Sequence, residues 1–247
     1  MKILALDSSG LVASAAVVEN DITIAEYTIN YKKTHSQTLL PMLDELRRMT
    51  ELDLHSVDAI AVAAGPGSFT GLRIGSATAK GLGLALDIPI IPVPTVDALA
   101  YNLYGSDKLI CPIMDARRNQ VYTGVYVFRK GAAVDGGYDM TVVEKQCVAD
   151  ISWIVGQINE LGADTEVLFL GDGVSVYRDK IAELIQVKYS FAPACCNRQR
   201  ASCVAVLGAV LYQQGEIETA AAHKPEYLRP SQAERERAEK KETGVCQ

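Results

Sequence analysis

Apolar positions along this chain switch between short continuous runs and helical stripes, and the switches follow the same order in both halves. In the first half, the pattern predicts strands at 3–6, 12–18, 21–30 and 57–64 and helices at 36–46 and 70–86. The first helix is marked by Leu39, Leu43 and Leu46, which recur at the spacing of one helical face. The second half predicts strands at 109–114, 121–128, 140–147 and 167–170 and a helix at 150–161. An α/β fold is therefore expected.

The two halves also share their turns. An aspartate, Asp7 or Asp115, follows the first strand of each half, and a glycine turn, starting at Gly65 or Gly171, follows the fourth strand. These turns are spaced almost equally, which indicates a duplicated βββαβα unit forming two lobes. The proline-punctuated stretch 89–106 predicts their boundary. The expected division is one lobe at 1–105, a second at 106–230 and a charged tail at 231–247.

Composition narrows the classes of function. The 247 residues are 49% hydrophobic, and the formal net charge is −6. An acidic chain lacks the basic surface that phosphate binding needs, so we expect no binding of nucleic acid by this chain alone. It shows no membrane-spanning run, no signal peptide and no metal-ligand spacing among its six cysteines, so we expect a cytoplasmic protein with free thiols. The adjacent Cys195 and Cys196 could be redox active or simply packed.

The most specific motif joins a predicted strand to a predicted helix and reads Gly65-Pro66-Gly67-Ser68-Phe69-Thr70-Gly71-Leu72-Arg73-Ile74-Gly75. A glycine turn before a helix can bind an anion, or it can simply allow a tight turn and close packing. It is not a phosphate-binding P-loop, because no Lys-Ser/Thr pair follows its glycines, and its glycine spacing misses the dinucleotide fingerprint.

The helix after this motif carries a ridge of small residues spaced by four, namely Gly71, Gly75, Ala79 and Gly83. A second small row occupies positions 77, 81 and 85. Such rows let another segment approach closely. Each glycine costs about 1 kcal/mol relative to alanine inside a helix, so packing has to recover that stability. The pattern fits burial in the lobe's own core and a subunit interface equally well.

Protease and hydrolase chemistry find no support in the sequence. The three histidines, His35, His55 and His223, are too dispersed for a metal-binding helix face, and no Gly-x-Ser-x-Gly motif is present. Asp7 and Asp115 follow buried strands, where α/β folds often bind ligands. A carboxylate that caps its own turn is at least as good an interpretation.

Several segments, taken in order, closely resemble the TsaB (YeaZ) family. Besides the glycine motif they are Leu4-Ala5-Leu6-Asp7-Ser8-Ser9, Thr34-His35-Ser36, Asp115-Ala116-Arg117-Arg118-Asn119-Gln120-Val121-Tyr122, Gly171-Asp172-Gly173 and Pro225-Glu226-Tyr227-Leu228-Arg229. The resemblance spans nearly the whole chain and implies an actin-like/Hsp70/sugar-kinase (ribonuclease H-like) fold of two lobes. The related TsaD subunit carries two metal-binding histidines on the corresponding helix, where this chain has none.

The resemblance also implies a function. Proteins of this family are non-catalytic scaffolds that bind and activate the TsaD-like transferase, which forms N6-threonylcarbamoyladenosine at adenosine 37 of tRNA. It further implies a TsaE-like ATPase as a second partner, contact with tRNA only through the complex, and a homodimer when the chain is alone. No cofactor is expected on the isolated chain, although a nucleotide could bind at a partner interface.

In that family the partner is held by the first two helices, which favours the interface interpretation of the small-residue ridge. The residues expected to bind the partner are Leu39, Leu43, Leu46, Gly71, Ile74, Gly75, Thr78, Ala79 and Leu82. The residues expected to reach the cleft between the lobes are Asp7, Ser8, Ser9 and Arg118. No catalytic or metal-binding residue is expected.

The alternative comes from a different class, an ATP-dependent phosphotransferase of the same fold. It would use Asp7-Ser8-Ser9 as a phosphate loop, with Asp115 or Asp172 near the metal. Neither half contains a Gly-Gly-Thr phosphate loop, which weakens this alternative.

Overall fold

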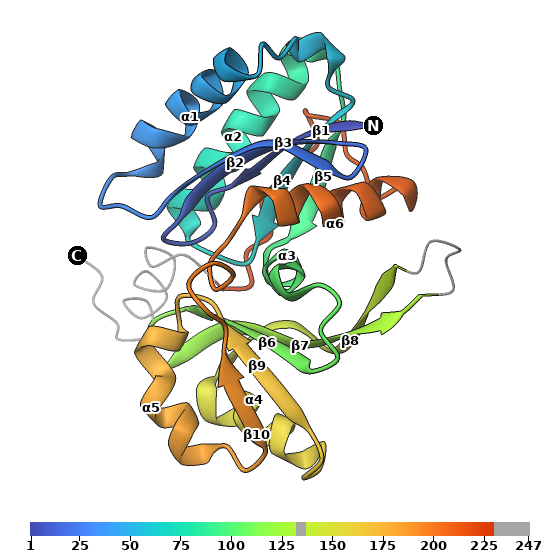
Figure 1. The fold of residues 1–247 in the computed structure, drawn as a ribbon. Helices are drawn as coiled ribbons and strands as arrows, with labels where there is room; N and C mark the ends of the chain where they lie inside the picture. The colour runs from blue at the N-terminus through green and yellow to red at the C-terminus, as the bar shows by residue number, and fades with distance from the viewer. Residues whose placement is uncertain (132–136, 230–247) are drawn as a thin grey trace, which may run out of the picture.

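The computed structural model describes residues 1–131 and 137–229. It contains two lobes, each built on a five-stranded mixed sheet with helices on both faces (Figure 1). The tail predicted at 231–247 lies outside the described residues. Within the described ranges, no helix combines the length and the apolar character needed to cross a bilayer.

The first lobe contains the elements that the hydrophobic pattern predicts, and two more. They are β1 (Lys2–Asp7), β2 (Ala13–Glu19), β3 (Ile22–Ile29), α1 (His35–Met49), β4 (Ala59–Gly65), α2 (Phe69–Leu86), β5 (Ile90–Pro94) and α3 (Thr95–Ala100), with 3-10 turns η1 (Leu54–Ser56) and η2 (Tyr101–Leu103). The strand order is β3-β2-β1-β4-β5, with β1 antiparallel to β2 and parallel to β4. Helices cover both faces of the sheet, so β1, β2 and β4 are buried almost throughout.

The second lobe repeats this plan. Its elements are β6 (Leu109–Asp115), β7 (Gln120–Lys130), β8 (Tyr138–Asp150), α4 (Ile151–Glu160), β9 (Glu166–Leu170), α5 (Val174–Leu184), β10 (Lys188–Phe191) and α6 (Ala201–Gln213). The strand order β10-β9-β6-β7-β8 matches that of the first lobe element for element. The duplication is therefore confirmed, and the unit is βββαβαβα, one strand and one helix longer than predicted.

The stretch 89–106, predicted as a boundary, is instead β5, α3 and η2. The boundary was predicted from the prolines of this stretch, but Pro92 and Pro94 belong to β5 at the edge of the sheet. An edge strand tolerates proline, since an N–H on its outer side needs no partner strand.

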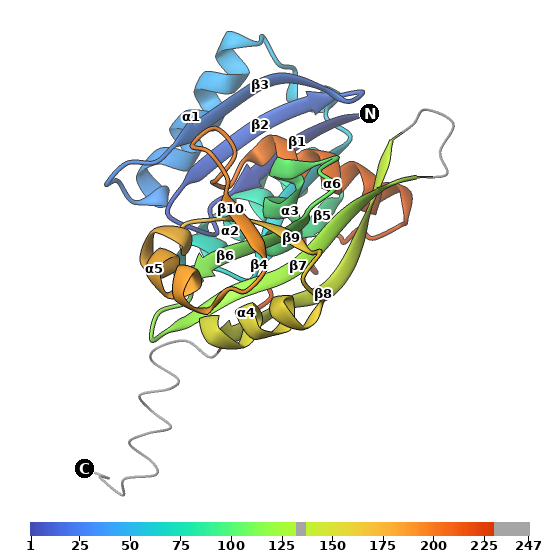
Figure 2. The same ribbon diagram turned by 60° about the horizontal axis from the view of Figure 1, so that its bottom comes forward.

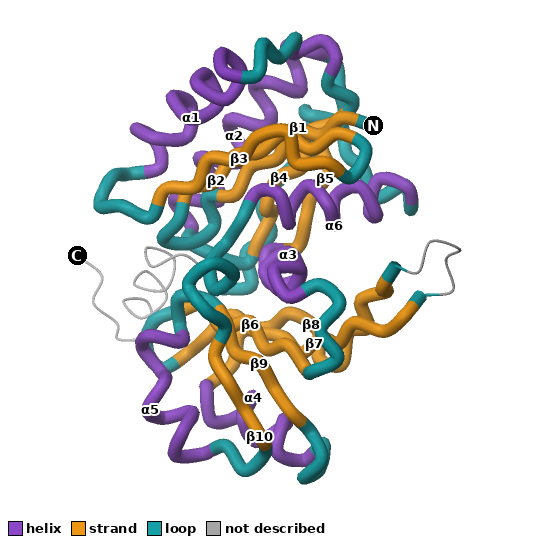
Figure 3. Tube along the Cα trace, viewed as in Figure 1, coloured by secondary structure: helices purple, strands orange, loops and turns teal. Residues whose placement is uncertain are grey.

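The last helix of each unit crosses to the other lobe, as the views in Figure 1, Figure 2 and Figure 3 agree. From α3, Val96 and Leu99 pack against Ile110 of the second sheet. Helix α6, from the second repeat, packs on the first sheet, on the face opposite α1 and α2. The division at 105/106 is therefore corrected, because 201–229 returns to the first lobe.

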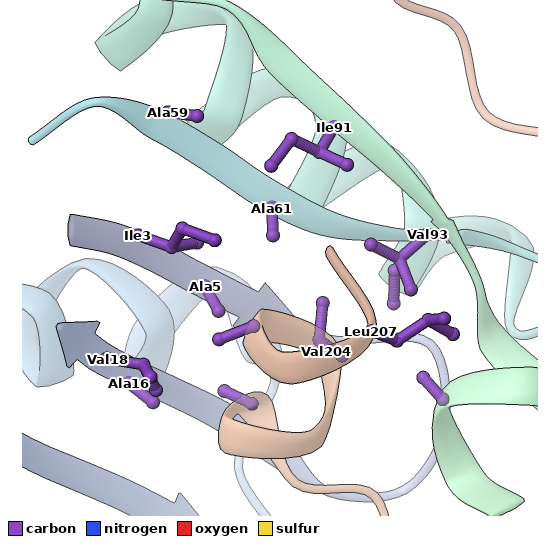
Figure 4. Close-up of a cluster of buried hydrophobic side chains, with 14 residues drawn as sticks. Ile3, Ala5, Ala16, Val18, Ala59, Ala61, Ile91, Val93, Val204 and Leu207 are labelled. Carbon is purple, nitrogen blue, oxygen red and sulfur yellow. The ribbon is translucent and has the colours of Figure 1, made fainter. Parts of the chain in front are cut away.

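Close packing holds α6 on the first sheet. Val204 and Leu207 enter a cluster with Ile3 and other small or branched side chains of the strands (Figure 4). A Cβ atom added to Gly208 would lie 3.0 Å from the Cβ of Ala61, so glycine and alanine together set the short distance between helix and sheet.

Candidate interlobe cleft and partner-binding face

The lobes enclose a cavity of about 480 Å³, lined by the loops that follow β1, β4, β6 and β9. In each sheet the first and fourth strands are parallel neighbours, so their carboxyl ends and the loops after them meet at one edge. The lining includes Ser9, Gly10, Gly67, Phe69, Asp115, Arg117, Asp172, Ser175, Tyr227 and Arg229. The loops between the lobes can be followed in Figure 3.

The turn after β1 is closed by its own aspartate. Asp7 is 1% exposed, and its Oδ1 accepts hydrogen bonds from the Ser9 N–H (2.9 Å) and the Ser9 hydroxyl (2.6 Å). Burial raises the pKa of this carboxyl to about 6, although the Ser9 hydrogen bonds act in the opposite direction. Of the two interpretations left open for Asp7, the capped turn describes its geometry.

The other residues expected in the cleft have separate places. The Ser8 hydroxyl is buried and donates to the Gly71 carbonyl oxygen (2.8 Å), which ties α2 to β1. Ser9 lines the cavity. Arg117, rather than Arg118, lines it from the second lobe.

Carboxylates in the second lobe also accept hydrogen bonds from the protein, Asp115 within its own turn and Asp172 from the end of β6. Asp115 Oδ1 accepts from the Arg117 N–H (2.8 Å) and the Tyr177 hydroxyl (3.2 Å). Asp172 Oδ1 accepts from the Asp115 N–H (3.2 Å), and burial raises the pKa of Asp172. Among the described residues, no group of three or more His, Cys, Asp or Glu side chains is placed to hold a metal ion. No pattern in the sequence predicts Tyr177 at this position.

The segment 217–229 runs beside α2 and closes the cavity at one side. Tyr227 packs on Phe69 with ring centroids 4.3 Å apart. The Arg73 guanidinium lies 4.1 Å from the Phe69 ring centroid and donates to the Tyr227 hydroxyl (3.3 Å). Arg229 donates to the Ala116 carbonyl oxygen of the second lobe. Only the family resemblance drew attention to this segment, because nothing in its residue pattern predicts the fold-back.

The glycine turn after β4 makes room for this segment. The Glu226 N–H donates to the Ala64 carbonyl oxygen (2.7 Å). A Cβ atom on Gly65 would lie 2.1 Å from the Glu226 carbonyl oxygen, and Gly65 has φ +127°. Gly171 has φ +106° at the matching place in the second lobe. Both positions thus require glycine for a tight turn and a close approach of backbone.

The small-residue ridge of α2 faces the lobe's own interior. A Cβ atom on Gly71 would lie 2.0 Å from the Ser8 carbonyl oxygen, and one on Gly75 would lie 2.5 Å from the Ser8 hydroxyl. Ala79 is buried in the same core. This corrects the expectation that these residues form the partner-binding surface, because a buried residue cannot touch a partner.

The same correction applies to two leucines of α1. Leu39 and Leu46 are buried against the first sheet, with 1% and 0% of their surface exposed. Half-buried positions remain predictions as partner contacts, namely Leu43, Ile74, Thr78 and Leu82.

The surface of α1 and α2 is formed by other residues. Leu40, Met49 and Leu84 are exposed by 58%, 63% and 63%. In the second small row, Ala77, Gly81 and Ala85 are exposed, and nothing lies within 4 Å of a Cβ added to Gly81. Leu40 and Met49 are nine positions apart and project from opposite sides of α1, so we define Leu40, Leu84 and the three small residues as the outer face. A groove of about 190 Å³ beside it is lined by Leu40, Leu43 and Leu82, among others.

Two duplicated lobes with this strand order, closed around a cleft, define the actin-like/Hsp70/sugar-kinase (ribonuclease H-like) fold that the family resemblance implies. A family model described as TsaD, tRNA N6-adenosine threonylcarbamoyltransferase, matches residues 23–237. The chain belongs to this family and, within it, to the TsaB (YeaZ) proteins.

Individual relatives agree. The Bacillus subtilis protein named tRNA threonylcarbamoyladenosine biosynthesis protein TsaB is 38% identical over 236 residues, 95% of this chain and 96% of the relative. The Escherichia coli protein of the same name is 35% identical over 129 residues, covering 51% of this chain and 55% of the relative. The solved structure of YeaZ from Pseudomonas aeruginosa is 26% identical, covers 92% of this chain and 99% of its own, and superposes with a TM-score of 0.73.

Proposed function

We propose that this chain acts in tRNA threonylcarbamoyladenosine biosynthesis as a non-catalytic scaffold that binds and activates a TsaD-like transferase. The transferase modifies adenosine 37, a TsaE-like ATPase joins the complex, and tRNA is reached only through it. Family membership supports the pathway. The acidic balance of −6 supports a subunit that leaves most contact with tRNA to its partners.

The outer face of α1 and α2 is the observation that carries the proposal. Leucine side chains exposed by more than half are unfavourable in water, and Leu40 borders the groove that Leu43 and Leu82 line between α1 and α2. Apolar surface gathered where two helices meet marks an interaction site. Open space over Gly81 lets a partner helix approach close to the backbone. Arg47–Asp44 and Arg48–Glu45 ion pairs on α1 supply charged residues, as in the polar rim of a protein interface.

In the absence of the transferase, the same outer face pairs two copies of this chain, so homodimer and complex exclude each other. The direct test is to purify the chain with the TsaD-like subunit and to measure tRNA threonylcarbamoylation with and without it. We expect a stable complex and activity that depends on this chain. Full activity of the transferase without it, or no association at micromolar concentrations, would refute the proposal.

Gly81→Leu is expected to weaken binding of the transferase at least about tenfold, or about 1.4 kcal/mol, because the side chain fills the space that a partner helix needs. Folding should not suffer, since this glycine is exposed and leucine favours the helix by up to about 1 kcal/mol. Titration calorimetry gives the affinity, and thermal unfolding checks the fold.

Gly156→Leu is the matched control. Gly156 lies in α4 of the second lobe and also has nothing within 4 Å of an added Cβ. The proposal requires unchanged affinity in this control. Equal losses in the two variants, or none in Gly81→Leu, would place the interface elsewhere.

The non-catalytic role has its own test. We expect the isolated chain to show no heat of binding with ATP and Mg²⁺, because Asp7 is buried in its own turn and Arg229 and Tyr227 close one side of the cleft. A nucleotide should bind only after the transferase is added, at their shared interface. Saturable binding by the isolated chain, with phosphoryl transfer, would instead support the phosphotransferase.

A further inference from the structure

The crossing from the second lobe back to the first carries two adjacent thiols. Residues 192–200 connect β10 to α6, and Cys195 and Cys196 lie at a turn in the middle of this connection. Their sulfur atoms are 4.0 Å apart. Cys195 is exposed and Cys196 is half-buried, so a small reagent can reach the first thiol, and the second is close enough to react with it next.

The other described cysteines are less accessible than Cys195. Cys111 is fully buried, and burial raises the pKa of its thiol to about 12. Cys203 donates to Asn102 Oδ1 (3.0 Å), and burial raises its pKa to about 12 as well. Cys147 is half-buried, and burial raises its pKa too. A thiol with a raised pKa forms little thiolate, which is the reactive species.

The Arg200 guanidinium acts on Cys203 as well as on the adjacent pair, so the exposure of Cys195 and the 4.0 Å between the two sulfur atoms are what set the pair apart. Burial raises the pKa of the Cys196 thiol, and the Arg200 guanidinium counteracts part of that rise. The same guanidinium interacts electrostatically with Cys195 and is held by an ion pair with Glu26. A fixed positive charge stabilises a thiolate beside it.

We propose that Cys195 and Cys196 form a reversible thiol–disulfide site whose oxidant is a low-molecular-weight disulfide. Cys195 loses its proton to water and attacks one sulfur of the small disulfide, which releases one small thiolate and leaves a mixed disulfide. Cys196 then loses its proton and attacks the Cys195 sulfur, which releases the second small thiolate. Two protein thiols are oxidised and one small disulfide is reduced to two thiols, so atoms and electrons balance.

Chain geometry makes this disulfide easy to reduce. Neighbouring Cα atoms are about 3.8 Å apart, shorter than the roughly 4.4–6.8 Å of ordinary disulfides. A bridge between adjacent residues is therefore strained, and strained, exposed disulfides are labile rather than structural. The pair should open again when the small thiol is in excess.

The disulfide would form within residues 192–200, a segment that several hydrogen bonds hold in place. The Gly171 N–H donates to the Asn197 carbonyl oxygen (3.1 Å), and Arg198 Nη1 donates back to the Gly171 carbonyl oxygen (3.1 Å). Asn102 Nδ2 donates to the Arg198 carbonyl oxygen (2.6 Å). A disulfide between Cys195 and Cys196 closes a small ring and rotates the backbone that makes these hydrogen bonds. Oxidation therefore loosens the contact between residues 192–200 and the second lobe.

Oxidised glutathione, added in excess to the full chain, tests the site by peptide mapping. Trypsin releases Tyr189–Arg198, a peptide that holds both thiols and no other cysteine. We expect this peptide to be lighter by two hydrogen atoms, to resist alkylation, and to recover after addition of reduced glutathione. Cys196→Ser should stop at a glutathione adduct on Cys195, whereas Cys203→Ser, the matched control, should close like the unmodified sequence.

Three results would overturn the proposal. They are full alkylation of both thiols in excess oxidant, a lasting glutathione adduct on Cys195 of the unmodified sequence, and a bridge from Cys195 to Cys203 or Cys246 instead. Hydrogen exchange of the Gly171 amide tests the consequence for the crossing. It should rise at least about tenfold on oxidation, and an unchanged rate would refute the loosening.

Discussion

Gly71→Ala is expected to destabilise this protein by about 3 kcal/mol or more, although the same change helps most helices. The added Cβ would lie 2.0 Å from the Ser8 carbonyl oxygen, a backbone atom held within β1 and its turn. Neither partner can move alone, because the Ser8 hydroxyl is also bonded to the Gly71 carbonyl oxygen. Helix and sheet must therefore separate, which costs packing along the whole contact.

Urea unfolding of the isolated chain measures this effect, and Gly81→Ala on the same helix is the matched control. Gly81 has open space around an added Cβ, so its replacement should stabilise the protein by up to about 1 kcal/mol. Opposite signs in the two variants would establish which face of α2 is the core. A change of less than about 0.5 kcal/mol in Gly71→Ala would show that the helix can shift without loss.

Asp7→Asn is expected to change how stability depends on pH. Burial raises the pKa of Asp7 from 3.8 to about 6 in the folded protein. Its protonated form therefore contributes stability that is complete below about pH 4 and is lost as the pH rises through about 6. A shift of this size corresponds to about 3 kcal/mol. Asparagine cannot ionise, and its Oδ1 can still accept both Ser9 hydrogen bonds.

The measurement is the free energy of unfolding of both proteins between pH 3.5 and 7.5, taken as a difference. Other groups titrate in both proteins and cancel, including Asp97 and Asp172, whose pKa values burial also raises. Relative to the original chain, the variant should gain about 3 kcal/mol between pH 4 and 6 and nothing further above that range. A difference that stays constant with pH would mean that Asp7 titrates as it does in water.

Local spacing predicted most of the fold. Hydrophobic periodicity predicts the strands and helices of the first half as far as α2, and the matched aspartate and glycine turns indicate the duplication. The predicted unit is one strand and one helix too short, because Pro92 and Pro94 indicate a boundary in the sequence pattern but belong to β5 in the structure. Helix α6 could not be assigned to a lobe from its residues, since the apolar stripe that carries Val204 and Leu207 would suit either sheet.

The candidate sites divide in the same way. Sequence correctly singled out α2 as a helix that needs cover, yet it offered two small rows, one with Gly75 and one with Gly81, that look alike in composition. It likewise left two roles open for Asp7, namely ligand binding and capping of its own turn. Contacts between segments that are distant in sequence decided which row is buried and what Asp7 does. Ser8 packs on Gly75, which is 67 residues further along the chain, and the turn that contains Ser8 also buries Asp7.

By itself, therefore, the sequence determined the α/β class, the duplicated order of elements and the membership in the TsaB (YeaZ) family. Each of these depends on spacing or identity along the chain. Only the tertiary structure decided which face of α2 is buried, which sheet α6 covers, and that segment 217–229 closes the cleft. Those outcomes depend on which surfaces come into contact after the chain crosses from one lobe to the other. Hydrophobic periodicity reflects only neighbours along the chain, so it cannot predict these contacts.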